Sequence, residues 1–279
     1  MKSGLQNMKR PALRYPGGKF RIADWVISHF PMHKNYVEPC GGGCSVLLRK
    51  DPVPVETYND IDGRVVNYFK VLRENPDKLI KLLKLTPWSR EELLNAKEKS
   101  QDPVEDARRV YVLYWQSFSR PGQSWRCMYK NDTRPREATK DIIDISFLYD
   151  ISKRLQHVQI ENKNALEIIE KYNHPDTLIY FDPPYISEKR VKKDLYIHET
   201  SDDFHKTAAD ILRKSKSYAL VSGYRSKLYK NIFENHGWVR FEKKSVAQAG
   251  SIITESLWLS PRTYNTFQDK SGFIPEMVV

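Results

Sequence analysis

The chain has few cysteines and no long apolar run. Only three of its 279 residues are cysteine and none forms a C-x-x-C pair, so neither a disulfide framework nor a structural zinc site is expected. The seven histidines show no ligand spacing, and no metal is assigned. No stretch approaches the roughly 18 apolar residues of a membrane span, and the polar first ten residues do not resemble a secretory signal. We therefore expect a soluble, unprocessed, cytoplasmic protein with no membrane partner.

Positive charge is in excess. The chain carries 46 Lys plus Arg against 35 Asp plus Glu, a formal net charge of +11. Phosphate contacts supply a large part of nucleic-acid affinity, so a polyanion is the first partner to consider. The alternative is that the charge serves solubility alone. Composition therefore suggests a nucleic acid without establishing it.

Strand-like and helical segments alternate in the first quarter of the chain and again in its second half. The expected strands are residues 36–38, 55–59, 158–161, 177–181, 217–222, 238–244 and 253–259. The expected helices between them are residues 19–30, 45–50, 62–74 and 165–171, together with one that Ser201 caps. This order predicts an α/β fold with a parallel sheet, whose ligand crevice lies beyond the carboxyl ends of the strands.

The middle of the chain has a different character. Helical patterns cover residues 77–85, 89–99, 103–118 and 142–155, and a polar segment rich in Arg, Lys, Pro and Gly fills residues 119–140. Structureless loops of that length are usually functional or disordered. We expect a discontinuous catalytic domain of residues 1–74 and 156–265, a helical insertion of residues 75–155 and a C-terminal tail of residues 266–279.

The sequence Asp182-Pro183-Pro184-Tyr185 follows the apolar run of residues 178–181. Proline has no backbone N–H and fixes φ near −65°, so two prolines leave carbonyl groups unpaired at the end of the strand. A carboxylate and a carbonyl there can each accept one hydrogen of an exocyclic amine, while Tyr185 stacks on the base. The alternative is a strand that simply ends in a Pro-Pro turn.

A glycine-rich segment, residues 38–45, joins a strand to a helix. Glycines allow a ligand to approach the backbone closely. The segment lacks the third glycine of a dinucleotide motif, where Val46 stands, and it lacks the Lys-Ser/Thr of a phosphate loop. Asp60 ends the next strand, where a ribose-binding carboxylate belongs in nucleotide folds. Together these features favour an adenosine-type cofactor, with a structural turn and a helix-starting Asp60 as the alternative.

Four segments, in this order, resemble the motifs of the Dam-like DNA adenine-N6 methyltransferases (D12 class, alpha-type). They are residues 14–19 (RYPGGK), 38–45 (EPCGGGCS), 59–62 (NDID) and 182–185 (DPPY). The resemblance implies a Rossmann-like S-adenosylmethionine-dependent methyltransferase sheet with an inserted small helical DNA-recognition subdomain. It also implies S-adenosyl-L-methionine as cofactor, S-adenosyl-L-homocysteine as product, and double-stranded DNA as partner.

The resemblance assigns roles to matching positions. Catalysis falls to Asp182, Pro183 and Tyr185, and cofactor binding to Tyr15, Lys19, Glu38, Gly42, Asp60, Asn164 and Asp182. Three positions depart from the family pattern: Asn164 stands where relatives usually carry an acid, Cys40 replaces a Phe, and Cys44 replaces a Gly. Cys44 places a side chain in the loop where none is expected, which makes cofactor affinity the property to test.

The implied reaction is site-specific methylation of adenine N6 after the base has been flipped out of the duplex. A loop with basic and aromatic residues is suited to clamping the DNA backbone. The expected DNA contacts are Arg120, Arg126, Lys130, Arg134 and Arg136, with Trp125 and Tyr129 as wedges, and a second cluster that begins with Lys189 and Arg190. A solvated charged loop is the alternative for each cluster.

Two other functions stay open at this point. Methylation of cytosine N4 or of a protein glutamine uses related motifs, although Asp182 in place of Ser or Asn favours adenine. A DNA-binding relative without catalysis is the alternative from another class. A cognate restriction endonuclease is a candidate partner, and we expect a monomer or weak dimer in a prokaryotic or viral host cell.

Overall fold

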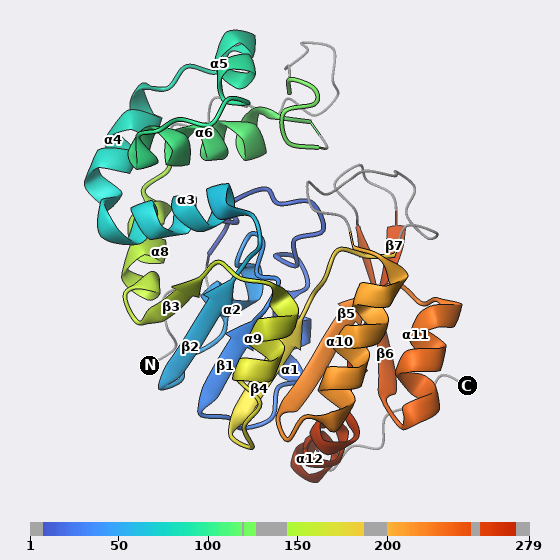
Figure 1. Ribbon diagram of the computed structural model, residues 1–279. Helices are drawn as coiled ribbons and strands as arrows, with labels where there is room; N and C mark the ends of the chain where they lie inside the picture. Colours follow the sequence, from blue (N-terminus) through green and yellow to red (C-terminus); the bar gives the residue numbers. More distant parts are fainter. Residues whose placement is uncertain (1–7, 119, 127–143, 187–199, 247–251, 272–279) are drawn as a thin grey trace.

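A seven-stranded sheet lies at the centre of the computed structural model, which describes residues 8–118, 120–126, 144–186, 200–246 and 252–271 (Figure 1). The strand order is β3-β2-β1-β4-β5-β7-β6. The strands are β1 (Asn35–Glu38), β2 (Val55–Asn59), β3 (Val158–Glu161), β4 (Thr177–Phe181), β5 (Tyr218–Gly223), β6 (Val239–Val246) and β7 (Ile252–Leu259). Strands β1 to β5 pair in parallel, whereas β7 runs antiparallel to both β5 and β6.

The order of the strands reverses between β1 and β4. The chain moves outward from β1 to β2 and β3 on one side, and from β4 to β5 on the other. The loops after β1 and β4 therefore diverge, and such a switch point is where open α/β sheets bind ligands. The predicted strands are confirmed to within two residues at each end, but the antiparallel pairing of β6 and β7 was not predicted.

Both faces of the sheet are covered. Along β4, Leu178 and Tyr180 join the core on one face, while Ile179 and Phe181 join the core on the other. A strand buried on both faces needs no polar alternation, which accounts for the uninterrupted apolar run of residues 178–181. The first face packs against α1 (Ala23–Ser28), α2 (Ser45–Arg49), α3 (Gly63–Glu74) and α8 (Phe147–Leu155). The second packs against α9 (Ala165–Lys171), α10 (Asp202–Lys214) and α11 (Lys227–Ile232) (Figure 1).

Several helices differ from the prediction. Helix α1 is shorter than the predicted 19–30 at both ends: residues 20–22 form a turn before it, and it ends at Ser28. Helix α11 and helix α12 (Pro261–Ser271) were not predicted, and α12 runs across the boundary that we placed between residues 265 and 266. Phe267 of α12 stacks on His29 with ring centroids 5.1 Å apart, so the start of the expected tail packs against the body. The predicted cap of α10 is confirmed, since Ser201 Oγ accepts from the Phe204 backbone N–H at 3.2 Å.

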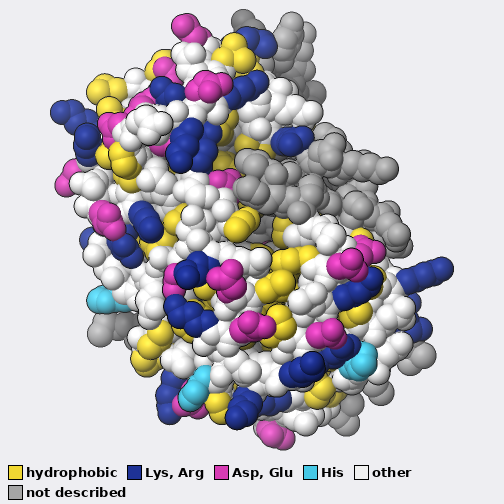
Figure 2. Space-filling view, viewed as in Figure 1, with side chains coloured by type: hydrophobic (Ala, Val, Ile, Leu, Met, Phe, Trp, Pro, Cys, Tyr) yellow, Lys and Arg dark blue, Asp and Glu magenta, His cyan; other side chains and the backbone are white. Residues whose placement is uncertain are grey.

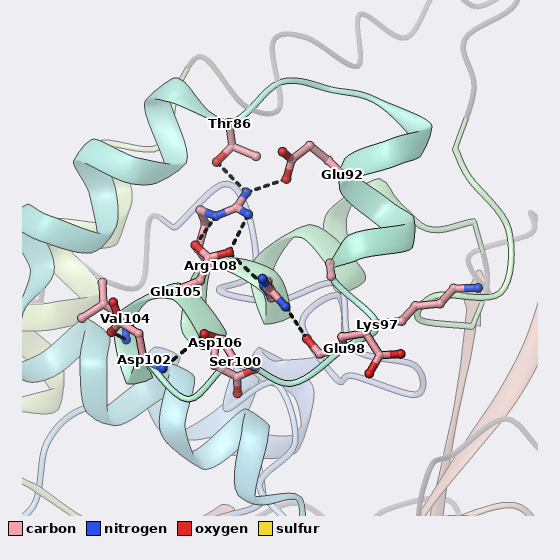
Figure 3. A network of polar contacts seen from close by, with 12 residues as sticks. Thr86, Glu92, Lys97, Glu98, Ser100, Asp102, Val104, Glu105, Asp106 and Arg108 are labelled. Carbon is pink, nitrogen blue, oxygen red and sulfur yellow. Dashed lines mark hydrogen bonds and ion pairs between the residues drawn. The ribbon is translucent and has the colours of Figure 1, made fainter.

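The predicted insertion, residues 75–155, contains α4 (Pro76–Leu85), α5 (Arg90–Asn95) and α6 (Pro103–Gln116), which stand apart from the sheet in Figure 1. It also contains α8, which packs against the sheet. A polar network joins α5 to α6, as Figure 3 shows: the Arg108 guanidinium donates to Glu92 at 2.6 Å and to Glu105 at 2.7 Å. The hydrogen bonds from Arg108 lower the pKa of Glu105 to about 2. Arg64 of α3 pairs with Asp106 of α6 at 2.9 Å, which ties the insertion to the sheet-bearing part.

Helix α6 leads into a short turn. Residues Ser117 and Trp125 form an isolated antiparallel bridge, and Phe118 N–H donates to Ser124 O at 2.8 Å. Helix α8, predicted from residue 142, begins at Phe147. Among the described residues, no helix is both long and apolar enough to cross a membrane.

Candidate active site

A cavity of about 460 Å³ lies at the carboxyl ends of β1, β2 and β4. All four sequence motifs contribute to its lining, through Tyr15 to Lys19, Glu38 to Gly43, Asp60 and Asp182. These segments are far apart in the sequence and meet because the parallel strands end at the same edge of the sheet. The cavity is thus at the predicted place.

The glycine loop packs tightly under the ring of Tyr15. A Cβ on Gly42 would lie 2.8 Å from that ring, and Gly42 has a φ of +48°, so only glycine suits the position. A Cβ on Gly43 would lie 2.9 Å from the Tyr15 Cβ. On its other side, Tyr15 stacks on Tyr114 of α6, with centroids 5.2 Å apart and planes at 16°. Tyr15 of the N-terminal motif therefore lies between the glycine loop and the insertion.

Cys44 does not reach the cavity. It is the N-cap residue of α2 with a φ of 57°, its side chain is fully buried in the core, and the cavity is lined by its neighbours Gly43 and Ser45. The side chain that distinguishes this loop from the family pattern therefore lies in the core. Cys40, the other departure from the family pattern, does line the cavity.

Asp60 holds the glycine loop to the end of β2. Its Oδ2 accepts from Gly42 N–H at 2.8 Å and its Oδ1 from Asp62 N–H at 2.9 Å. The carboxylate also lines the cavity. The sequence pointed to a ligand contact here but missed this support of the loop.

Glu38 is a buried carboxyl in the wall of the cavity. It is 3% exposed, and its Oε1 accepts from both Tyr36 Oη and Leu47 N–H at 2.7 Å. Burial raises the pKa of Glu38 to about 8 even though both hydrogen bonds lower it. Without a cationic ligand the group is therefore mostly protonated at neutral pH.

Asp182 lies against the ammonium group of Lys19. The Lys19 Nζ is 3.0 Å from Asp182 Oδ1, donates to Gly17 O at 2.6 Å, and lies 4.6 Å from the ring centroid of Tyr185. Burial raises the pKa of Asp182 to about 6, and the Lys19 charge opposes that rise. Asp182 is thus mostly ionised at neutral pH and ready to accept hydrogen bonds.

Tyr185 is enclosed. It is 4% exposed, its hydroxyl donates to Glu255 Oε2 at 2.8 Å, and its ring meets Tyr224 edge-on at 4.6 Å. The stacking face expected from the sequence is covered by Lys19 in this structure. Glu255 and Tyr224 were missed, since they come from β7 and the end of β5 and carry no local signal.

The prolines of the motif differ in position. Pro184 lines the cavity, and its carbonyl accepts from Thr200 Oγ1 at 2.9 Å. Pro183 is buried and is not among the lining residues. Thr200 also lines the cavity and was missed, because residues 187–199 separate it from the motif in sequence.

The far end of the cavity is partly apolar. Asn164 lines it and caps α9, because its Oδ1 accepts from Leu166 N–H at 2.9 Å. Its amide NH₂ is therefore the group that can face a ligand. Ile61, which is 52% exposed, and Phe204 of α10 also line this end and were missed. An exposed isoleucine directly after the acidic Asp60 was the available signal.

The expected DNA contacts are only partly within the described residues. The Arg126 guanidinium lies 4.9 Å from the ring centroid of Trp88, and Arg90 lies 5.1 Å from that of Trp125. Arg120 is half-buried, while Phe118, which we had not nominated, is 57% exposed. Outside the described residues lie Tyr129, Lys130, Arg134, Arg136, Lys189 and Arg190.

Basic side chains are not concentrated in one patch of the visible surface. Figure 2 shows Lys and Arg interspersed with Asp and Glu over the face drawn there. In the part of the chain that the structure describes, no group of three or more His, Cys, Asp or Glu is placed to hold a metal ion.

Comparison with known proteins gives a family for this site. The family model of the D12 class N6 adenine-specific DNA methyltransferases matches residues 15–247. The Type II methyltransferase M.MjaIII of Methanocaldococcus jannaschii is 25% identical over 246 residues, covering 78% of this chain and 82% of that protein. A DNA adenine methylase of Haemophilus influenzae is 28% identical over 197 residues, covering 63% of this chain and 64% of that protein.

A solved structure is also similar. A putative methylase from Haemophilus influenzae aligns over 87% of each chain, with 12% identity and a TM-score of 0.36.

Proposed function

The chain belongs to the family of D12 class N6 adenine-specific DNA methyltransferases, and we propose that it transfers a methyl group from S-adenosylmethionine to adenine N6 in double-stranded DNA. The observation that carries the proposal is the meeting of Asp182, Lys19, the glycine loop and Asp60 around a single cavity. The chain spans 64% of the length of the Haemophilus relative.

The cavity fits an adenosine-type cation. Tyr15 and the glycine loop line the cavity together, and the carboxyl groups of Glu38, Asp60 and Asp182 line the same space. Asp60 would accept from the ribose hydroxyls, and Ile61 and Phe204 would contact the adenine ring. When bound, S-adenosylmethionine supplies an electrophilic methyl group on a sulfonium, which is a good leaving group.

The residues after β4 would orient the target amine. The lone pair of adenine N6 is delocalised into the ring, so the site must favour a geometry in which it points at the methyl carbon. Asp182 and the carbonyl of Pro183 would accept the two N6 hydrogens. An ionised Asp182 suits this role, because its pKa of about 6 leaves it charged at neutral pH yet more basic than an ordinary aspartate.

Lys19 must move before an adenine can occupy this position. Its ammonium both pairs with Asp182 and covers the ring of Tyr185, which are the contacts proposed for the amine and the base. Displacing the ammonium breaks an ion pair but frees Lys19 Nζ to bind an acceptor elsewhere in the site. We therefore place Lys19 among the residues that rearrange when the substrate binds.

Base flipping would bring the amine to the site. Extruding a base costs a few kcal/mol, and stacking on an aromatic side chain restores roughly 1 to 3 kcal/mol. Arg120 and Arg126, in the turn after α6, would contact the DNA backbone, and the exposed Phe118 is available to contact an unstacked base. The insertion of residues 75–155 is the proposed recognition subdomain.

The test is transfer of labelled methyl groups to unmethylated DNA, followed by identification of the modified nucleoside. We expect N6-methyladenine from the wild-type protein and none from Asp182→Ala, with S-adenosylmethionine binding by calorimetry retained in part. Asp182→Asn is also expected to be nearly inactive, because its amide NH₂ is a hydrogen-bond donor and the target N6 amine needs an acceptor. N4-methylcytosine as the product, or near-normal turnover in either variant, would contradict the assignment.

Two finer points are also proposals. A cognate restriction endonuclease is a candidate partner, since a relative carries the name Type II methyltransferase. A monomer or weak dimer in the cytoplasm is proposed, and sedimentation of the purified protein with and without DNA tests the oligomeric state.

A further inference from the structure

Glu255 is a buried carboxyl group beside the proposed catalytic residues. It lies on β7 and is 6% exposed. Ser256 pairs with Gly223 across the antiparallel strands, so Glu255 and Tyr224 occupy the next position of the pair. Burying a carboxylate is costly unless it is paired or hydrogen-bonded, so its contacts need an explanation.

Its contact is with the aromatic residue of the Asp-Pro-Pro-Tyr motif. Glu255 Oε2 accepts from the Tyr185 hydroxyl at 2.8 Å. Tyr224 meets the same ring edge-on at 4.6 Å, and Lys19 Nζ lies 4.6 Å from its centroid. By holding the hydroxyl at the far end of the Tyr185 side chain, Glu255 thus fixes the tilt of the tyrosine ring.

Glu255 also acts on Asp182 through its charge. Burial is the main cause of the raised pKa of Asp182, the Lys19 ammonium lowers it, and the negative charge of Glu255 raises it. The titratable groups whose interactions with Asp182 the structure shows come from the N-terminal motif, β1, β4, the loop after β1, the loops after β4 and β5, and β7. They are Lys19, Glu38, Cys40, Tyr180, Tyr185, Tyr224 and Glu255.

We propose that Glu255 is a positioning residue for methyl transfer: it orients the ring of Tyr185 through the tyrosine hydroxyl, and its negative charge keeps Asp182 a stronger hydrogen-bond acceptor. The proposal rests on the proposed function. It separates into a geometric part, which needs an acceptor at residue 255, and an electrostatic part, which needs a charge there.

Three substitutions separate these parts. Glu255→Gln keeps an acceptor for the Tyr185 hydroxyl but removes the charge, Glu255→Ala removes both, and Tyr185→Phe removes the donor. The matched control is Glu242→Gln on β6, the neighbouring strand, whose partner is Arg240. Each protein is compared by the single-turnover rate of methyl transfer to unmethylated plasmid DNA, by calorimetry with S-adenosylmethionine, and by thermal unfolding.

We expect Glu255→Ala to lower the single-turnover rate by about 10- to 100-fold, the range for one hydrogen bond to a charged group, with cofactor affinity unchanged. Glu255→Gln should recover most of that loss. The double variant Tyr185→Phe with Glu255→Ala should be no slower than the slower single variant, because both remove the same contact. Two outcomes would overturn the geometric part: a rate loss in the double variant equal to the product of the two single losses, or a Glu255→Ala enzyme as fast as Glu242→Gln.

A readout independent of activity tests the charge. In cofactor-free protein labelled with ¹³C at aspartate carboxyl carbons, Asp182 is assigned by its loss in Asp182→Asn. Its titration should move to lower pH in Glu255→Gln and stay in place in Glu242→Gln, and an unmoved titration in Glu255→Gln overturns the electrostatic part. An inactive wild-type protein overturns the proposed function instead, and the titration still decides the effect of the charge.

Discussion

Replacing Glu38 by Gln should make the protein more stable than wild type as the pH rises. The pKa of Glu38 is raised by burial from 4.5 to about 8 in the folded protein. A raised pKa contributes stability that is fully present below the unfolded value and is lost as the pH rises through the folded value. Glutamine has no proton to lose, and its carbonyl still accepts from Tyr36 Oη and Leu47 N–H.

The magnitude follows from the two pKa values. Between them, wild type should lose about 1.4 kcal/mol of unfolding free energy per pH unit relative to Glu38→Gln. Above pH 8, the difference in unfolding free energy between Glu38→Gln and wild type should therefore exceed its value at acid pH by an amount on the order of 3 to 5 kcal/mol.

Urea unfolding of the cofactor-free proteins, followed by circular dichroism from pH 5 to pH 9, measures this difference. Asp182→Asn is the control, because burial raises the pKa of Asp182 from 3.8 to about 6. Its difference in unfolding free energy from wild type should therefore develop at lower pH and level off earlier than that of Glu38→Gln. A Glu38→Gln difference that stays constant between pH 5 and pH 8 would refute the reasoning.

Four further substitutions test the binding loop and the insertion. Cys44→Gly should leave the dissociation constant of S-adenosylmethionine unchanged by calorimetry, since the side chain is in the core, and a tenfold change would contradict that placement. Gly42→Ala should abolish cofactor binding, because its Cβ would lie 2.8 Å from an aromatic ring, and normal binding would show that the loop yields easily. Asp60→Ala should raise the cofactor dissociation constant more than it lowers the maximal rate, a ground-state loss that single-turnover rates at saturating cofactor can separate. Arg126→Ala should weaken DNA binding and flatten its salt dependence by about one logarithmic unit, and an unchanged slope would exclude a phosphate contact.

The parts of the fold that follow local patterns could be predicted from the sequence. The uninterrupted apolar residues of β4 indicate a strand buried on both faces, and the structure confirms it. Ser201 followed by two aspartates indicates a helix start for the same local reason. The direction of β7 could not be predicted, because pairing with β5 and β6 depends on contacts between residues distant in sequence.

The residues of the site also differ in whether local sequence order predicts their positions. Asp60 and Asp182 each end a strand, so their meeting at one edge of the sheet follows from the order of the elements. Glu255 was missed because a charged residue within a strand indicates an exposed position, whereas its burial depends on Tyr185. The burial of Cys44 could not be predicted, because a loop sequence does not reveal on which side of the backbone a left-handed residue places its side chain.

The stack of Tyr15 on Tyr114 links the insertion to the glycine loop. Tyr114 lies on α6 and does not line the cavity, yet the ring that it supports is the one against which Gly42 and Gly43 pack. Arg64 and Asp106 hold the same helix to α3. The turn that carries Arg126 follows directly from α6. The DNA contacts proposed there would therefore act on a helix that is already joined to the proposed cofactor loop. If DNA orders α6, the loop would be restricted with it, and thermodynamic linkage would then require the cofactor to favour DNA binding by the same factor by which DNA favours cofactor binding.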